Sequence, residues 1–333
     1  MIAASFKIFF AVGILFWLVS SGKLDFKLMN DLLNSGSNLS WGLFFILLSI
    51  TLTSLRWKFI LEVKASRKLS FKKIFPINWI GLFFSTFLPG VVTGDVLKLL
   101  YVKDIDKKFS KTFLLTSVVM DRVFGLCGLL FLTGVISAYN YQSLIAKSAD
   151  VKILLHTNFL LFAGSCFFIT CLFLPKKLQE VVLNLIKFVP VLGEKVANTF
   201  EQVWLFGKNK KTTLTCLGLS IFTQFFNILG FWMLTSPFYG KEITLGQAYG
   251  FIPIGLLATA IPIAPAGAGV GHAVFDKLFA LVGVSGGASL FNLYFLSMLM
   301  MNLLGVIPYL LIGKKHSVKE AESFEHSEAT KEA

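Results

Sequence analysis

Apolar residues follow one another along this chain in long runs, broken by short polar stretches, from near the first residue to about position 312. A helix that crosses a membrane needs about 20 consecutive apolar residues, and most of the runs approach or reach that length. The pattern therefore predicts an all-α polytopic membrane protein. The apolar segments cover residues 4–20, 40–61, 74–92, 112–138, 157–174, 214–235, 244–262, 270–284 and 288–312.

The segment 74–92 is the first that does not read as a simple span. Both neighbouring loops are basic, with seven Lys and Arg in 56–73 and five in 95–111, and cytoplasmic loops hold the excess of such residues. The segment also ends in Leu88-Pro89-Gly90, which breaks a helix. A re-entrant hairpin that enters and leaves on the cytoplasmic side accounts for both observations.

The second broken element is 261–271, which holds two prolines and three glycines in eleven residues. It joins two short apolar segments, 244–262 and 270–284. An ordinary tight loop between two spans is one reading, and a broken or re-entrant pair is the other, which we favour. We thus expect about six full spans and two broken elements that enter from opposite faces. Paired broken helices in the two halves of a membrane protein point to a transport site.

Residues 175–213 form neither a span nor a simple loop. Leu178, Val181 and Leu185 recur at helical spacing, with Lys and Glu on the other faces. This predicts one or two amphipathic helices on the cytoplasmic interface, within an integral membrane domain that covers 1–312. The polar tail 313–333 is expected to be disordered and cytoplasmic.

Composition supports a lipid environment. Hydrophobic residues are 55% of the 333 positions and charged residues only 15%, against about a quarter in soluble domains. The net charge of +13 gathers in the loops, so the expected partners are membrane lipids and not nucleic acid. We expect a bacterial-type inner (plasma) membrane location with both termini cytoplasmic. No cofactor or metal motif is present, and the cysteines read as buried small apolar residues.

Asp121 and Arg122 lie inside the segment 112–138. A charge at that depth costs several kcal/mol unless it is paired or hydrated. Adjacent residues do not face each other on a helix, so each needs its own partner. Arg122 could bind an anionic head group from a water-filled cavity, or the pair could form ion pairs that join helices. Both readings stay open on the sequence alone.

The two broken elements supply the remaining candidates for lipid binding. Thr93 is a plausible N-cap for a helix that runs into Lys98, and helix N-termini bind phosphate through their N–H groups. His272 and Asp276 are four residues apart and share a helix face. The candidates are Pro89, Gly90, Thr93, Gly94, Asp95 and Lys98 in the first element, and Pro262, Pro265, Gly267, Gly269, His272 and Asp276 in the second.

These residues carry a resemblance to a known family. Leu88-Pro89-Gly90 with Gly94-Asp95 and Lys98, then Asp121-Arg122 with Gly125, then Ile261-Pro262 with Pro265, Gly267 and Gly269 follow one another along nearly the whole chain. In this order they resemble the lysylphosphatidylglycerol synthase transmembrane-region family of flippase-like membrane proteins. Lys98 stands where that family usually has Arg, and His272 where it commonly has Glu, which puts an acid role at position 272 in doubt.

The resemblance implies lipid translocation without naming the lipid. The best-understood members move aminoacylated phospholipid between leaflets and carry a fused soluble transferase domain, which this sequence does not show. We therefore expect a translocase for an anionic phospholipid or a polyprenyl-linked lipid. One alternative is a membrane-embedded transferase that uses a lipid-linked donor, with Asp95 or Asp121 as base. The other is an accessory subunit of a lipid or glycan pathway.

Overall fold

The computed structural model describes residues 26–87, 91–139, 141–142, 149–187, 193–240, 243–259 and 269–312. Within these ranges every regular element is a helix. The elements are α2 (Phe26–Asn34), α3 (Ser37–Glu62), α4 (Phe71–Phe87), α5 (Val91–Ile105), α6 (Lys111–Tyr139), α8 (Ala149–Leu172), α9 (Lys176–Lys187), α10 (Gly193–Lys208), α11 (Lys210–Thr235), the 3-10 turn η1 (Ser236–Phe238), α12 (Leu245–Thr259), α13 (Val270–Leu281), α14 (Gly287–Leu303) and α15 (Val306–Ile312).

Five of the described helical segments are long and apolar enough to cross a membrane: Ser37–Glu62, Lys111–Tyr139, Leu155–Leu172, Lys210–Phe238 and Gly287–Ile312. They match five of the six predicted full spans. The sixth, 4–20, lies outside the described residues, as does the tail 313–333. The chain is therefore an all-α polytopic membrane protein, as the apolar pattern predicted.

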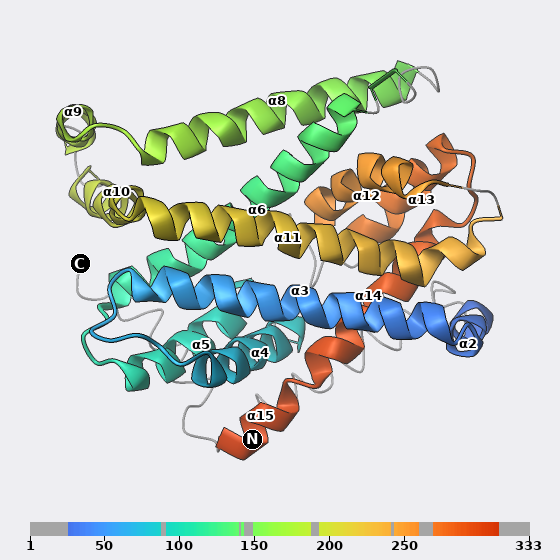
Figure 1. Ribbon diagram of the computed structural model, residues 1–333, viewed down its shortest axis with the longest axis horizontal. Coiled ribbons are helices and arrows are strands. Elements are labelled where there is room, and N and C mark those ends of the chain that lie inside the picture. Colours follow the sequence, from blue (N-terminus) through green and yellow to red (C-terminus); the bar gives the residue numbers. More distant parts are fainter. Residues whose placement is uncertain are drawn as a thin grey trace.

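The helices α3 and α11 run side by side through the middle of the molecule (Figure 1). Small residues allow this close approach. A Cβ added at Gly230 would lie 3.2 Å from the carbonyl oxygen of Gly42. Small residues at such contacts are the usual means by which membrane helices pack, because lipid supplies no hydrophobic drive between them.

The helices α4 and α5 pack against each other as a hairpin. The loops that flank this hairpin touch, since the Ser66 N–H donates to Oδ2 of Asp106 at 2.8 Å. The chain therefore enters the bundle and returns to the same end, as the two basic loops predicted. Two details were wrong. The predicted basic loop 95–111 is helix as far as Ile105, and its Lys98 is buried. The helix α5 begins at Val91, so Thr93 lies inside it and is not its N-cap.

The helices α12 and α13 form the second pair, and Figure 1 shows them toward the opposite end of the bundle from α4 and α5. Gly255 lets them meet, because a Cβ there would lie 2.3 Å from the ring of Phe275. The prolines and glycine of the connection, Pro262, Pro265 and Gly267, lie outside the described residues, as do Pro89 and Gly90 of the first hairpin.

Two short helices, α9 and α10, occupy most of the predicted amphipathic range 175–213, and its last residues, 210–213, already belong to α11. All of α9 is solvent-accessible, including its apolar residues Leu178, Val181 and Leu185.

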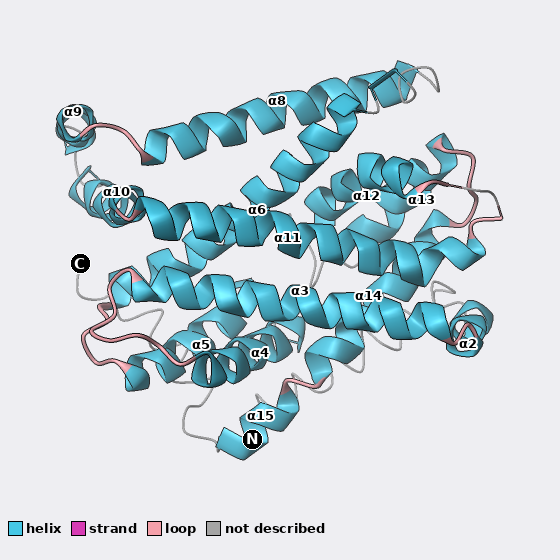
Figure 2. Cartoon of the chain, in the orientation of Figure 1, coloured by secondary structure: helices cyan, strands magenta, loops and turns pink. Residues whose placement is uncertain are grey.

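The last predicted span is likewise built from two helices, α14 and α15, separated by a turn (Figure 2). Gly305 in that turn packs on α4, where a Cβ would lie 2.4 Å from the Trp79 carbonyl oxygen.

The core has two parts. One is rich in aromatic rings and joins α2, α3, α6, α11, α12, α13 and α14, with Phe231, Phe275 and Phe291 at its centre. The other joins α3, α4, α5, α6, α8, α10 and α11, with Trp57, Phe113 and Phe124 fully buried. The helices α3, α6 and α11 contribute to both parts, and polar side chains gather between them.

Candidate functional site

Arg56 of α3 and Asp121 of α6 form a buried ion pair. The Arg56 Nε donates to Asp121 Oδ1 at 2.7 Å, and both side chains are at most 10% exposed. A second donor, Nη1 of Arg56, reaches the Ser220 hydroxyl of α11 at 3.0 Å. Three long helices are thus joined at one guanidinium, which is the kind of partner the intramembrane Asp121 required.

The sequence reading missed Arg56. It was counted among the seven basic residues of the loop 56–73, whereas the structure buries it within α3. The available signal was its position inside the apolar segment 40–61 and beside Trp57. A basic residue with apolar neighbours on both sides belongs to the helix and not to the loop.

The second charged group centres on Asp95 of α5. It accepts hydrogen bonds from the Nε and Nη2 of Arg122 on α6, the former at 3.1 Å. Its other oxygen lies 2.8 Å from the Lys98 Nζ, one turn along the same helix. Asp95 is therefore shared by two cations.

Lys98 is itself enclosed. It is 5% exposed, its Nζ lies 3.4 Å from Asn78 Oδ1, and the same atom sits 4.5 Å from the centre of the Trp57 ring. The ring face offers further electrostatic stabilisation to an ammonium that lacks water. Lys98 is thus held as a fixed partner of Asp95 behind Arg122.

Two glycines make room for these charges. A Cβ on Gly94 would lie 2.4 Å from the Ser85 backbone nitrogen and 2.7 Å from the Gly81 carbonyl oxygen, so α5 can approach α4 only with glycine at this position. A Cβ on Gly125 would lie 3.3 Å from Arg56 Nη1. The glycines beside Asp95 and after Asp121-Arg122 therefore have a packing reason, independent of any ligand.

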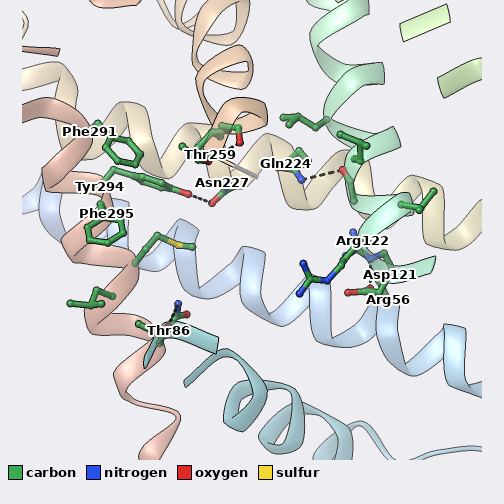
Figure 3. A pocket seen from close by; sticks show the side chains of 18 residues that line it. Arg56, Thr86, Asp121, Arg122, Gln224, Asn227, Thr259, Phe291, Tyr294 and Phe295 are labelled. Atoms are coloured by element: carbon green, nitrogen blue, oxygen red, sulfur yellow. Dashed lines mark hydrogen bonds and ion pairs between the residues drawn. The ribbon is translucent and has the colours of Figure 1, made fainter. Parts of the chain in front are cut away.

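A cavity of about 540 Å³ opens beside the charged groups. Arg56, Asp121 and Arg122 stand at one end of it (Figure 3). Arg122 is the accessible one, because its side chain is 48% exposed whereas that of Arg56 is 5% exposed. Arg122 thus forms an ion pair with Asp95 and still faces open space, which combines the two readings left open by the sequence.

The opposite end of the cavity is aromatic. Phe291, Tyr294 and Phe295 of α14 face the charged end across the α11 residues Gln224 and Asn227 (Figure 3). The Tyr294 hydroxyl donates to Asn227 Oδ1 at 2.9 Å, and Gln224 Nε2 donates to the Gly125 carbonyl at 3.2 Å. The cavity therefore has a charged end, an uncharged polar side and an apolar aromatic end.

Asn302 of α14, which also lines the cavity, carries one side-chain polar atom without a hydrogen-bond partner among the described groups. Asn302 donates through Nδ2 to the Thr86 hydroxyl oxygen at 3.1 Å. Its Oδ1 is buried and meets no hydrogen-bond donor among the described groups. A buried acceptor left in this way costs about 1–3 kcal/mol, so it marks a point where a ligand or water donor would be stabilised.

The structure brings together only part of the predicted set. Asp121 and Arg122 line the cavity, with Asp95 and Lys98 behind Arg122, and Gly94 lies in the α4–α5 contact. A role for these residues in lipid binding stays a prediction.

The described residues of the second element lie outside the cavity lining. His272 is buried and its Nδ1 accepts from the Gly269 N–H at 3.2 Å, while its ring packs edge-on against Phe291. Asp276 is exposed and its Oδ1 accepts from the Ala288 N–H at the start of α14. These two residues share a helix but not a site.

The comparisons with known proteins agree with the order of the motifs. No curated protein and no solved structure matches the chain. A family model described as the lysylphosphatidylglycerol synthase TM region matches residues 3–313, nearly the whole chain. The protein is thus a member of the lysylphosphatidylglycerol synthase transmembrane-region family.

Proposed function

We propose that the protein is a lipid translocase that moves an anionic phospholipid or a polyprenyl-linked lipid between the leaflets of the inner membrane, with both termini cytoplasmic. The observation that carries this proposal is the half-exposed side chain of Arg122 at the wall of a cavity between membrane helices. Arg presents a planar fork of donors that matches the oxygens of a phosphate.

The dimensions and lining of the cavity support this assignment. About 540 Å³ is the size of a pocket for a small ligand, which suits a head group while the acyl chains stay in lipid. The rest of the lining is mostly apolar, with Leu126, Leu129, Leu256 and Met298 among its members. A site of this kind lowers the cost of bringing a charged head group across the apolar interior.

The transferase alternative needs a carboxylate that can take a proton from the acceptor. A general base must stand within hydrogen-bond reach of that proton. Asp95 accepts from Arg122 and Lys98, and Asp121 accepts from Arg56. Both candidate carboxylates are therefore engaged by cations, and the arrangement favours translocation over base catalysis.

Reconstitution into vesicles tests the proposal. Purified protein is placed in vesicles that carry trace phosphatidylglycerol with a fluorescent acyl chain, and an impermeant reductant bleaches the outer leaflet. Translocation will expose more than the outer-leaflet half of the label, and Arg122→Ala will return the signal to that of protein-free vesicles. Bleaching limited to the outer leaflet with wild-type protein would contradict translocation of this lipid. New lipid products in the same vesicles, detected by mass spectrometry, would favour the transferase.

A further inference from the structure

We infer that the cavity selects a head group that carries a single phosphate negative charge and an uncharged polyol, and that it discriminates against head groups bearing an ammonium. This inference rests on the proposed function and specifies the substrate class of the same site. It differs from the head group that the family's best-understood members move, which is aminoacylated and therefore carries ammonium groups.

The first observation is the charge of the cluster that borders the cavity. Arg56, Lys98 and Arg122 are paired with the carboxylates of Asp95 and Asp121. Three cations against two carboxylates leave a formal charge of +1. Because Arg122 is half exposed at the cavity wall, the net positive charge of these described groups attracts one negative charge, such as that of a phosphodiester.

The second observation is what the cavity does not offer to an ammonium. Asp121 is the carboxylate in the described lining, and Arg56 already occupies it. The undescribed stretches 88–90 and 260–268, next to the two hairpins, hold no Asp or Glu. The aromatic rings of α14 could attract a cation by about 0.5–2 kcal/mol, but the net positive charge of the same site opposes it.

The third observation is the orphan acceptor on Asn302. The Thr86 hydroxyl donates to the Leu82 carbonyl at 2.9 Å, so toward Asn302 its oxygen can act only as an acceptor. This fixes the amide with Nδ2 toward Thr86 and leaves Oδ1 buried without a donor from the described part of the chain. A ligand hydroxyl is a donor of the required kind, and it adds no charge.

The neutral polar groups extend around the cavity from that point. Asn227, Gln224 and Thr259 continue the lining from α11 and α12. The Thr259 hydroxyl donates to the Leu256 carbonyl at 2.7 Å, so its oxygen remains an acceptor for other donors. A head group with several hydroxyls would therefore meet acceptors on more than one side while its phosphate faces Arg122.

Binding to the detergent-purified full chain tests this selectivity without requiring transport. The probes are phosphatidylglycerol, lysylphosphatidylglycerol and phosphatidylethanolamine with identical acyl chains, compared by native mass spectrometry and by the shift in thermal unfolding. We expect phosphatidylglycerol to bind at least tenfold more tightly than either ammonium lipid. Equal or tighter binding of lysylphosphatidylglycerol, or no binding of phosphatidylglycerol, would overturn the inference.

Asn302→Leu tests the orphan acceptor by a readout that a structural role would not give. Removing a buried acceptor that lacks a donor should leave the thermal stability of the lipid-free protein unchanged or raised, while phosphatidylglycerol affinity falls about tenfold. Asn34→Leu on the exposed face of α2 is the matched control and should change neither. Unchanged phosphatidylglycerol affinity in Asn302→Leu would remove the assigned role of this residue.

The binding experiment tests the head-group selectivity and the transport experiment tests translocation, so each claim can fail without the other. Selective binding of phosphatidylglycerol without movement in vesicles would retain the inference and reject translocation. Movement of the ammonium lipids in preference to phosphatidylglycerol would retain translocation and reject the inference.

Discussion

Arg56 and Asp121 are 65 positions apart in the chain, yet they form a direct ion pair between α3 and α6, with 2.7 Å between Nε and Oδ1. Removing one member of a buried pair leaves the other charge uncompensated, at a cost of about 3–5 kcal/mol. We expect Asp121→Asn to destabilise the protein by that amount, measured as thermal or denaturant unfolding in detergent. The double variant Arg56→Met/Asp121→Leu should recover most of the loss. Wild-type stability of Asp121→Asn would show that the pair does not hold the helices.

Arg122 should respond differently to substitution. Asp95 keeps Lys98 as a partner when Arg122 is removed, so Arg122→Ala should cost no more than about 1–2 kcal/mol, well below a broken pair. Transport in vesicles should nevertheless be abolished in Arg122→Ala and markedly reduced in Arg122→Lys, because Lys lacks the planar fork. A wild-type transport rate in Arg122→Ala, at wild-type protein abundance, would exclude phosphate binding by this residue.

Gly94 should be intolerant of even the smallest side chain. The added Cβ of Gly94→Ala would overlap the backbone of α4 at Ser85 and Gly81, and overpacking of this kind costs about 1–3 kcal/mol. Gly218→Ala in α11 is the control, because a Cβ there meets nothing within 4 Å and alanine favours a helix by up to about 1 kcal/mol. The two variants should therefore shift the unfolding temperature in opposite directions, and equal shifts would contradict a tight α4–α5 contact.

The orientation of the first hairpin can be tested in intact cells. Cysteines that replace Lys64 and Lys107 lie in loops that the Ser66–Asp106 hydrogen bond holds together. Both should be protected from an impermeant thiol reagent if this end of the bundle is cytoplasmic, in a background that lacks the four native cysteines. Labelling at Lys107 alone would require α4 to cross the membrane without returning. Labelling at both positions would reverse the proposed orientation.

The same loop junction should depend on pH. Hydrogen bonds from the Ser66 N–H, and then from the Lys108 N–H, lower the pKa of Asp106 below its ordinary value of 3.8. A carboxyl whose pKa falls on folding contributes stability above its unfolded pKa. That contribution is present above pH 3.8 and is lost as the pH drops through the lower folded value.

Hydrogen exchange of the Ser66 amide measures this contribution. Protection should persist near pH 4 and weaken at more acid pH in the wild type. Asp106→Asn, which accepts through one oxygen only, should show weaker protection and little pH dependence beyond that of intrinsic exchange. Identical pH profiles for the two proteins would exclude the carboxylate as the group that holds the loops.

The sequence predicted the spans well because apolar length is a local property that lipid imposes on each helix separately. The first hairpin was predicted because two basic loops and a proline-glycine break constrain the path together. The bonding partners were not predicted. The charges of Asp121 and Arg122 inside an apolar segment indicated that each needs a partner. The sequence did not indicate that these partners are Arg56 and Asp95, because sequence separation does not show which helices meet.

The cap assigned to Thr93 failed for a related reason. A threonine soon after a proline and a glycine resembles an N-cap, but α5 already includes Val91, so Thr93 lies within the helix. Arg56 was misplaced because its charge was counted with the loop 56–73, although it lies inside the predicted apolar segment 40–61 and the helix continues to Glu62. The orphan oxygen of Asn302 depends on two side chains and one backbone carbonyl from two helices, and it has no signature in the sequence.

Lys98 gives the site a permanent counter-ion for the Asp95 carboxylate. In the proposed translocation, a phosphate would draw Arg122 away from Asp95. The carboxylate would keep the ammonium that lies 2.8 Å from it, and Trp57 and Asn78 hold that ammonium in place. Loading and release then exchange one anion for another on Arg122 without uncovering a charge in the apolar interior. With a neutral residue at position 98, each transport cycle would leave the Asp95 carboxylate without a cation. The buried lysine would therefore keep the exchange reversible at little energetic cost.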